Sequence, residues 1–458
     1  MLYLPRLLCL LLFLAALPVG AVRADEPRKK RPNIIFLLAD DLRWNVLGCT
    51  GDKLARTPNL DALAKRGSNF RNTFVTTSIC AVSRASILSG QYARRHKIND
   101  FATSFTADAY ARTYPMLLKS AGYRVGFIGK FGVGNKMPDK SFDYWKGFPG
   151  QGVYFGKGET VHLTHRMGDQ ALEFLRSCNK DQPFCLSVSF KCPHAMDAAK
   201  REYPPDPRDE ALFKDVRFPI STTAHPMHFL TLPKFVQDSE SRKRWERRFK
   251  TEAMFQEVLR DYYRLVTGMD REIGRIVAEL ERLGLTEDTI IVFTSDNGYF
   301  FGERGLADKW YLYEESIRVP LIVFDPALPK QMRNRTVDAM ALNIDLAPTM
   351  LDYAGVAIPK SMQGLSLRPW LNGEAPKWRE DWFYEHHTAV KIIPPSEGVR
   401  TARWTYLRWL KDASNPVEEL YDLQTDPLQE RNLAPLVEHQ KTLQQLRARW
   451  DHLRKDLE

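Results

Sequence analysis

A short stretch of the chain, residues 78–84 with the sequence SICAVSR, places a thiol and a guanidinium four residues apart. The run over residues 83–88 has the pattern of the first turns of a helix, which puts Cys80 at a helix start. Free backbone N–H groups and the positive end of the helix dipole stabilise an anion at such a position. Arg84 lies one turn along on the same face and can reach the same anion. The stretch predicts an anion site with a reactive atom, whereas a lone cysteine elsewhere is more often a small buried hydrophobic side chain.

Two predicted strands each end in a pair of oxygen-bearing side chains. The first strand covers residues 33–39, a continuous apolar run, and the second covers residues 289–294, which are mostly β-branched or aromatic. The four side chains are Asp40, Asp41, Asp296 and Asn297. Open α/β sheets bind ligands at the carboxyl ends of their strands, and ligand sets made of oxygen select Ca²⁺ or Mg²⁺ over Zn²⁺. The two pairs together predict a hard-cation site, although either pair alone could be a strand cap or a turn.

Three more residues with positive or proton-transferring side chains lie in equivalent places. Lys130 and His194 each follow a predicted strand, and Lys309 ends the segment GLADK. Together with Arg84 they could surround a tetrahedral anion and neutralise the charge that develops on its leaving oxygen. These residues predict a site for sulfuryl or phosphoryl transfer.

The motifs resemble those of the type I sulfatases of the alkaline phosphatase superfamily. The resemblance rests on residues 31–41, 57–64, 80–84, 122–130, 295–298 and 309–315, and on ELYDL at 419–423 with Asp426 and Pro427. It implies that a formylglycine-generating enzyme oxidises Cys80 to formylglycine. It also implies that Ca²⁺, rather than Mg²⁺, is held by the modified Cys80 and by the four oxygen-bearing side chains at the two strand ends.

The resemblance also implies a mechanism. The formylglycine aldehyde hydrates to a geminal diol, which attacks sulfur, loses a proton from its second hydroxyl and expels sulfate as the aldehyde reforms. Arg84 and Lys130 would hold the nucleophile and the anion. His194 or Lys309 would protonate or stabilise the departing alkoxide. The implied activity is hydrolysis of a sulfate ester or sulfamate on a carbohydrate.

Three positions depart from the family pattern. Val82 stands at the third place of Cys-x-Pro/Ala-x-Arg, Gly132 replaces the histidine of Gly-Lys-x-His, and Arg304 replaces the histidine of Gly-Glu-His-Gly. Two alternatives stay open. A phosphodiesterase or phosphonate hydrolase of the same superfamily can use a similar anion geometry, and the three departures motivate the other alternative, a catalytically silent protein that binds sulfated glycans.

The elements that must position these residues alternate along the chain. Helices are predicted over residues 114–121, 165–178 and 252–283, and strands over residues 33–39, 123–128, 184–190, 289–294 and 319–324. This alternation predicts an α/β fold with a large, mostly parallel or mixed sheet between helices, and the resemblance implies the alkaline phosphatase-like version of it. A strand at 403–409 and a helix at 440–457 predict a smaller C-terminal α+β domain with a short antiparallel sheet.

The length and composition suit an exported globular protein of more than one domain. The chain has 458 residues, of which 44% are hydrophobic and 27% charged. Residues 1–24 read as a signal peptide, residues 25–375 as the catalytic domain and residues 376–458 as the C-terminal domain. No second apolar stretch is long enough for a transmembrane anchor, so we expect a periplasmic or extracellular protein. Five cysteines then remain, and an odd count leaves at least one unpaired.

The charge of the chain favours acidic partners. The formal net charge of +10 falls to about +8 without Arg6 and Arg23 of the signal peptide. The densest basic cluster, residues 242–248, reads as a solvated helix face, so we expect no nucleic-acid partner. A sulfated or uronic polysaccharide fits the charge.

Four residues outside the main motifs are predicted to contact the sugar: Arg304, His386, His387 and Arg400. The competing interpretation is that they are ordinary surface polar residues.

Overall fold

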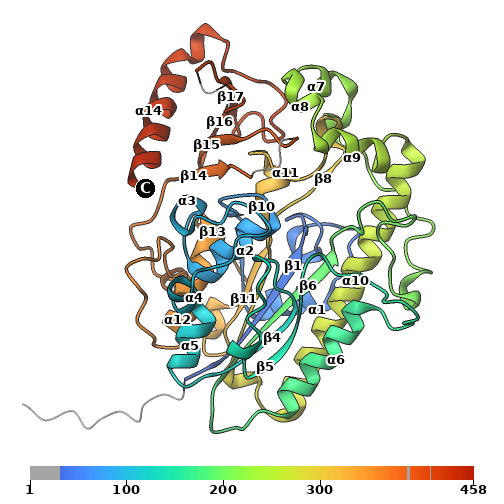
Figure 1. Cartoon of the computed structure of the whole chain (residues 1–458), viewed down its shortest axis with the longest axis vertical. Coiled ribbons are helices and arrows are strands. Elements are labelled where there is room, and N and C mark those ends of the chain that lie inside the picture. The colour runs from blue at the N-terminus through green and yellow to red at the C-terminus, as the bar shows by residue number, and fades with distance from the viewer. Residues whose placement is uncertain (1–30, 389–391, 413, 458) are drawn as a thin grey trace, which may run out of the picture. The chain divides into compact units, whose positions relative to one another are not determined.

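An eight-stranded sheet forms the core of the protein in this computed structural model (Figure 1). The structure describes residues 31–388, 392–412 and 414–457, so the predicted signal peptide lies outside the described residues. The strand order is β12-β2-β11-β7-β1-β6-β4-β5. The strands are β1 (Asn33–Asp40), β2 (Ser68–Phe70), β4 (Arg124–Lys130), β5 (Tyr144–Phe148), β6 (Phe184–Pro193), β7 (Thr289–Ser295), β11 (Leu321–Phe324) and β12 (Arg335–Val337).

The five strands from β7 to β5 in this order run parallel. Ala39 of β1 lies opposite Ser295 of β7, and Asp40 lies opposite Pro193 of β6. All residues of β1, β6 and β7 are buried, which explains why residues 33–39 of β1 read as a continuous apolar run. Because parallel strands end at the same edge, the segments that follow β1, β4, β6 and β7 meet there.

Helices cover both faces of this sheet. Alternate residues of β1 belong to two apolar clusters, with Ile35 and Leu37 in one and Ile34 and Phe36 in the other. The first cluster includes α1 (Pro58–Arg66), α6 (Leu163–Arg176) and α10 (Glu252–Leu283), and the second includes α2 (Cys80–Ser89), α5 (Tyr114–Ser120) and α12 (Leu346–Tyr353). The bounds of α10 match the predicted helix because Thr251 caps its start and Gly284, at a φ of 67°, ends it.

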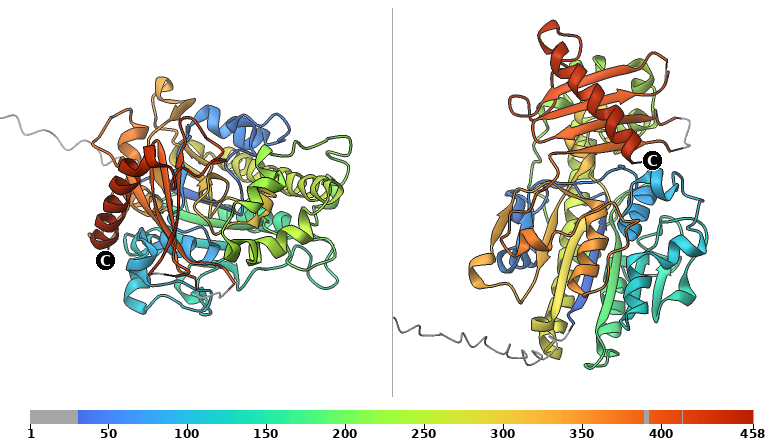
Figure 2. Two further views of the ribbon diagram at one scale, coloured as in Figure 1. Left: turned by 90° about the horizontal axis from the view of Figure 1, so that it is seen from above. Right: turned by 90° about the vertical axis from the view of Figure 1, so that its left-hand side faces the viewer.

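The C-terminal part forms a separate antiparallel sheet. Its strands are β14 (Asp381–His386), β15 (Ser396–Thr401), β16 (Trp404–Trp409) and β17 (Val417–Asp422). The terminal helix α14 (Gln440–Asp456) lies across this sheet, as Figure 2 shows. The predicted α/β class, with a large mixed sheet between helices and a small antiparallel sheet at the C-terminus, is confirmed, while the domain boundary at residue 375 stays a prediction.

One predicted strand is divided in the structure. Residues 319–324 contribute to β10 (Arg318–Val319) and β11, which belong to different sheets and are separated by Pro320. A proline lacks the N–H that would continue a ladder, so the chain changes sheets at this point.

Short elements complete the chain. The small sheets contain β3 (Thr73–Phe74), β8 (Phe300–Phe301), β9 (Ala307–Asp308), β10 and β13 (Ala341–Leu342). The short helices are α3 (Ala93–His96), α4 (Ala107–Ala111), α7 (Pro226–Leu230), α8 (Lys234–Gln237), α9 (Glu240–Arg248), α11 (Glu314–Ile317) and α13 (Arg368–Leu371). Within the described residues, no helix combines the length and the apolar character that crossing a bilayer requires.

Candidate active site

Cys80 is the first residue of α2, at the edge of the sheet where the parallel strands end. The preceding residue, Ile79, is extended, and its carbonyl accepts the first helical hydrogen bond from Ser83 at 2.9 Å. The prediction of a helix start at the thiol is therefore confirmed, with the helix beginning three residues earlier than its pattern indicated. Only 2% of Cys80 is exposed, so the thiol lies inside the protein, beside the free N–H groups of the first turn.

Arg84 connects this helix to the ends of the strands. Its Nε donates to Asp296 Oδ2 at 2.8 Å, and its Nη1 donates to the Lys130 carbonyl at 2.6 Å and to Ser189 Oγ. Its Nη2 lies 3.3 Å from Asp40 Oδ2. Although burial opposes the charge, Asp296 and Asp40 raise the pKa of Arg84 further. The guanidinium therefore stays charged and fixes α2 against the strands that end in Asp40, Lys130 and Ser295.

Two lysines pair with the two adjacent aspartates. Lys130 Nζ lies 2.5 Å from Asp40 Oδ2, and Lys309 Nζ lies 2.5 Å from Asp41 Oδ1. Asn297 Nδ2 also donates to Asp41 Oδ1, at 2.6 Å. All five residues are at most 3% exposed. The structure thus brings together the residues predicted from distant parts of the sequence.

His194 faces the same aspartates. Its Nδ1 lies 2.6 Å from the Ala195 carbonyl, and its Nε2 lies 3.7 Å from Asp41 Oδ2. Since a carbonyl only accepts, Nδ1 carries a proton, and in the neutral ring Nε2 is the free lone pair. Burial holds the pKa of His194 well below its usual value. A neutral His194 therefore presents a proton acceptor to the site.

The carboxylates have unequal proton affinities. Burial alone would raise the pKa of Asp40, but Lys130 and Arg84 hold it well below its usual range. Burial and the Asp40 charge raise the pKa of Asp296 to about 7. Packing three buried carboxylates together is unfavourable unless more positive charge is present.

The donor set fits a hard cation. Asp40 Oδ1 and Asn297 Oδ1 are buried and have no hydrogen-bond partner. Ligand atoms of Asp40, Asp41 and His194 lie within 4.8 Å of one another. Asp41 adopts a φ of 64°, which is uncommon for a residue other than glycine. Buried oxygens without donors, beside carboxylates, are what Ca²⁺ or Mg²⁺ would satisfy, because both cations take oxygen ligands.

The structure adds residues that the sequence reasoning missed. Gln151 Oε1 accepts from Lys130 Nζ at 2.6 Å, and Ser189 Oγ lies between Arg84 and the Lys130 carbonyl. Neither residue lies in a motif with chemical character. Ser189 could have been suspected, because it is a polar residue near the end of a predicted buried strand.

The prediction that the basic cluster at residues 242–248 is a solvated helix face is wrong for Arg244 and Arg248. Arg248 is 1% exposed and bonds to Asp308, and Arg244 bonds to the same carboxylate. Asp308 precedes Lys309, so α9 anchors the segment that carries this lysine. Asp308 and Trp310 have φ values of 68° and 89°, and a bulky residue seldom adopts the latter.

Two of the family departures have a structural consequence. Gly132 has a φ of 71°, and a Cβ there would lie 2.7 Å from Arg84 Cδ, so any side chain at 132 would displace Arg84. Val82 is 1% exposed and packs in an apolar cluster with Phe74 and Ile79.

The residues predicted to contact sugar are engaged with the protein itself. Arg304 bonds to Glu315 at 3.1 Å and to the carbonyls of residues 428 and 429. Arg400 Nε donates to Glu314 at 2.8 Å, and His386 is fully buried. His387 pairs with Glu397 at 2.8 Å and keeps 36% of its side chain exposed. Sugar contact by these four residues stays a prediction.

Comparisons with known proteins agree on one family. A family model described as Sulfatase matches residues 32–356, and one described as N-sulphoglucosamine sulphohydrolase, C-terminal, matches residues 302–456. The chain is 31% identical to an N-acetylglucosamine-6-O-sulfatase of Bacteroides thetaiotaomicron, over 95% of this chain and 89% of that protein. It is 27% identical to an arylsulfatase of Clostridium perfringens, over 91% and 93% of the two chains.

A solved structure extends the likeness to the fold. It is a protein in complex with its substrate, D-glucosamine-2-N,6-O-disulfate. It is 27% identical to this chain, covers 93% of this chain and 98% of its own, and superposes with a TM-score of 0.82.

Proposed function

This chain belongs to the sulfatase family, and we propose that it removes the 6-O-sulfate from a glucosamine residue of a sulfated saccharide. The reaction is hydrolysis: the ester takes up water and gives the sugar alcohol and inorganic sulfate. The observation that carries the proposal is the convergence of Cys80, Arg84, Lys130, His194 and Lys309 around three carboxylates at one sheet edge. The sugar follows from the relative and the solved complex, which act on or bind 6-O-sulfated glucosamine.

We assign two groups to this site beyond the encoded side chains. Asp40, Asp41, Asp296 and Asn297 would hold Ca²⁺, which would supply positive charge for the sulfate oxygens. Cys80 would be the precursor of formylglycine, whose hydrate supplies the nucleophilic oxygen. The position of Cys80 at a helix start, next to the cationic side chains, supports this assignment.

The protein's own residues divide the remaining work. Arg84 and Lys130 hold the anion, since both are charged, buried and fixed by carboxylates. Lys309 lies beside Asp41 and stabilises the alkoxide that leaves. His194 presents a neutral Nε2 to the site, which accepts the proton of the attacking hydroxyl and then donates it to the leaving oxygen.

Export and maturation are part of the same proposal. Residues 1–24 would direct the chain out of the cytoplasm, and a formylglycine-generating enzyme would act on Cys80 before folding buries it. A periplasmic or extracellular location would give access to sulfated polysaccharides.

Two measurements test the proposal. Mass analysis of the tryptic peptide that ends at Arg84 should show a mass lower by the thiol-to-aldehyde difference. The matured enzyme should release sulfate from glucosamine 6-sulfate faster than from 2-O- or 4-O-sulfated sugars, and faster than it cleaves an aryl phosphodiester. Preference for the phosphodiester would favour a phosphodiesterase instead. Binding of sulfated sugars without turnover by fully matured protein would favour a silent binding protein.

A further inference from the structure

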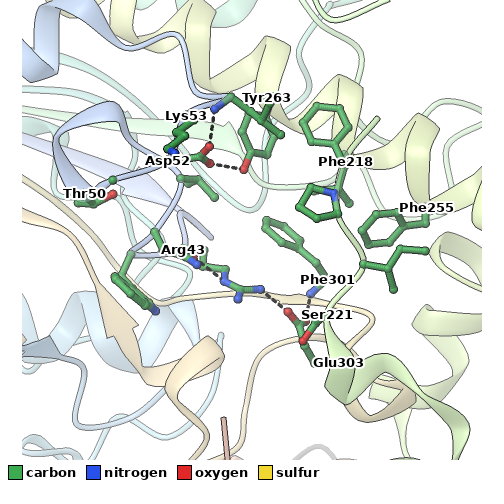
Figure 3. Close-up of a pocket in the computed structure, with 18 residues that line it drawn as sticks. Arg43, Thr50, Asp52, Lys53, Phe218, Ser221, Phe255, Tyr263, Phe301 and Glu303 are labelled. Atoms are coloured by element: carbon green, nitrogen blue, oxygen red, sulfur yellow. Dashed lines mark hydrogen bonds and ion pairs between the residues drawn. The ribbon is translucent and has the colours of Figure 1, made fainter. Parts of the chain in front are cut away.

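Lys191 is a buried cation without a carboxylate partner. It lies in β6, on the segment that leads to His194, and is 1% exposed. By contrast, Arg43 in the turn after β1 pairs with Glu303 at 2.5 Å, where both residues line a cavity of about 550 Å³ (Figure 3). Lys191 forms no such pair with any residue that the structure describes, and its Nζ donates to the Ala195 carbonyl at 3.1 Å. Burying an ammonium in this way is costly, so the residue at this position is not there for stability alone.

Lys191 and His194 share one hydrogen-bond acceptor. The Ala195 carbonyl oxygen that accepts from Lys191 Nζ also lies 2.6 Å from His194 Nδ1. A carbonyl oxygen has two lone pairs, so it can accept both protons at once. The backbone closes the same turn, because the His194 N–H donates to the Lys191 carbonyl at 2.9 Å. The ammonium therefore fixes the oxygen to which the imidazole is bonded.

The bond to this carbonyl decides which nitrogen of His194 can accept a proton. With a proton on Nδ1, the lone pair of Nε2 points toward Asp41, 3.7 Å away. If the carbonyl turned away, Nδ1 would lose its acceptor and the proton could move to Nε2. A ring that carries its proton on Nε2 accepts none there. The carbonyl thus keeps the imidazole in the tautomer that can act as a base toward the site.

Tyr154 supports the same arrangement. Its hydroxyl donates to the His194 carbonyl at 2.7 Å, and Lys191 Nζ lies over its ring, 5.1 Å from the centroid. An aromatic face stabilises a cation where no carboxylate is available. Burial and Lys130 lower the pKa of Lys191 to about 8, so the amine is still mostly charged at neutral pH. Its charge also disfavours a second proton on the neighbouring imidazole.

We propose that Lys191 is a positioning residue for His194, which holds the Ala195 carbonyl and, through it, the imidazole in the orientation and tautomer that proton transfer requires. The effect on turnover rests on the proposed function, whereas the arrangement of the three residues rests on their hydrogen bonds. A purely structural role predicts that the protein loses stability without the ammonium. Positioning predicts lost turnover with stability unchanged or higher, because an apolar side chain removes the cost of burying the charge.

Lys191→Met removes the donor and keeps the length of the side chain. With matured enzyme and a series of phenyl sulfates, kcat/KM should fall at least about tenfold for the least acidic leaving phenol and change little for the most acidic, which leaves without a proton. His194→Ala should show the same dependence on the leaving group, and Lys191→Met added to it should cause no further loss. The melting temperature of Lys191→Met should not fall.

The matched control is Lys146→Met in β5. Lys146 Nζ also lies over a tyrosine ring, 5.5 Å from the centroid of Tyr144, but this lysine is exposed and lies outside the site. Lys146→Met should keep the kcat/KM of the unmodified chain for every phenyl sulfate in the series.

The tautomer of His194 can be measured without turnover. In protein labelled with ¹⁵N in histidine, the nuclear magnetic resonance spectrum of the unmodified chain should show His194 with Nδ1 protonated and Nε2 bare. In Lys191→Met the two chemical shifts should move toward each other, because the two tautomers would then exchange. His194→Gln assigns the two signals by removing them.

The outcomes separate this proposal from the proposed function. Unchanged shifts in Lys191→Met, an equal fall in kcat/KM for all phenyl sulfates, or a lower melting temperature overturns the positioning role. Failure of the matured enzyme to release sulfate from glucosamine 6-sulfate overturns the substrate assignment instead, and the phenyl sulfates and the spectrum still decide the role of Lys191. If the matured enzyme hydrolyses no sulfate ester, the proposed function is wrong and the spectrum decides that role.

Discussion

Two groups of charged and polar side chains lie close together in this protein and differ in how completely they are hydrogen-bonded. The site cluster contains Asp40, Asp41, Asp296, Arg84, Lys130, Lys309 and Asn297. The Arg248 cluster contains Arg248, Arg244, Asp308, Asp197 and Glu202. In the site cluster, Asp40 Oδ1 and Asn297 Oδ1 have no hydrogen-bond partner. In the Arg248 cluster, every nitrogen of the Arg248 guanidinium donates, to Glu202, Asp308, Tyr299 and Asp197.

This difference in hydrogen bonding distinguishes a cluster that can bind a ligand from a cluster that has a structural role. Unpaired buried polar atoms are costly, so a cluster that keeps them has capacity for a ligand. A fully bonded cluster has none, and it holds its segments together. Arg248 bridges the loop after β6, which carries His194, and the segment that carries Lys309. The Arg248 cluster thus holds the loop that carries His194 against the segment that carries Lys309, a member of the site cluster.

The largest expected effect is loss of turnover in Cys80→Ala, because this change removes the precursor of the nucleophile. We expect sulfate release to fall by at least about 10⁴-fold, while the melting temperature changes little. Cys185→Ala, which changes another buried free thiol, is the matched control and should keep its activity. Comparable activity in the two variants would contradict the assignment of Cys80.

The next largest effect is expected from Arg248→Met, which breaks the Arg248 cluster. The change leaves Glu202 and part of the charge of Asp308 uncompensated, and removing one partner of a buried pair costs about 3–5 kcal/mol. Urea denaturation should show this loss in the free energy of unfolding. Arg247→Met on the same helix is the control, since Arg247 is 43% exposed and lies 3.9 Å from Glu202. It should cost less than about 0.5 kcal/mol, and equal losses would remove the distinction between the clusters.

Calcium should stabilise the protein by binding to the site cluster. At a concentration one hundred times its dissociation constant, a ligand that binds only the folded state adds about 2.7 kcal/mol. Scanning calorimetry of chelated protein should therefore show a rise in melting temperature when Ca²⁺ is added. Asn297→Leu should lose this rise because it removes an unpaired oxygen.

The control for the calcium experiment is Asn69→Leu. Asn69 also has a buried, unpartnered side-chain oxygen, but it lies in β2, outside the site cluster. This variant should respond to Ca²⁺ as the unmodified chain does. A calcium response that survives Asn297→Leu, or disappears in Asn69→Leu, would contradict the placement of the ion.

The sequence predicted the site cluster far better than the Arg248 cluster. Asp40, Asp296 and Cys80 are recognisable because each follows or begins an element with a strong apolar or helical pattern, and parallel strands must end together. Arg248, in contrast, bonds to Asp308 at a separation of 60 residues that no local pattern records. A basic helix with a solvated face and one with buried guanidiniums have the same composition, and only tertiary packing separates them.

The fold was predictable to a similar extent. Helix α10 and the central strands were found because periodicity and caps act locally, whereas β14, β15 and β17 obtain their stability from cross-strand partners. Likewise, the division between β10 and β11 depends on which sheet each half joins. Pro320 in the sequence indicated a break but not the change of sheet.

His386 is a third kind of buried polar group, one that is stable only without charge. Its replacement has the smallest predicted effect. Burial and the neighbouring His387 lower the pKa of His386 to about 3. Because the unfolded chain protonates this histidine below about pH 6.5 and the folded chain does not, its contribution is full above that pH and is lost as the pH falls toward 3. The free energy of unfolding should decrease by about 2 kcal/mol between pH 7 and pH 5 from this residue. His386→Gln should flatten that dependence, and His452→Gln, at a side chain 60% exposed on α14, should not. An unchanged pH profile in His386→Gln would mean that the buried imidazole accepts a proton in the folded state, which would contradict the lowered pKa.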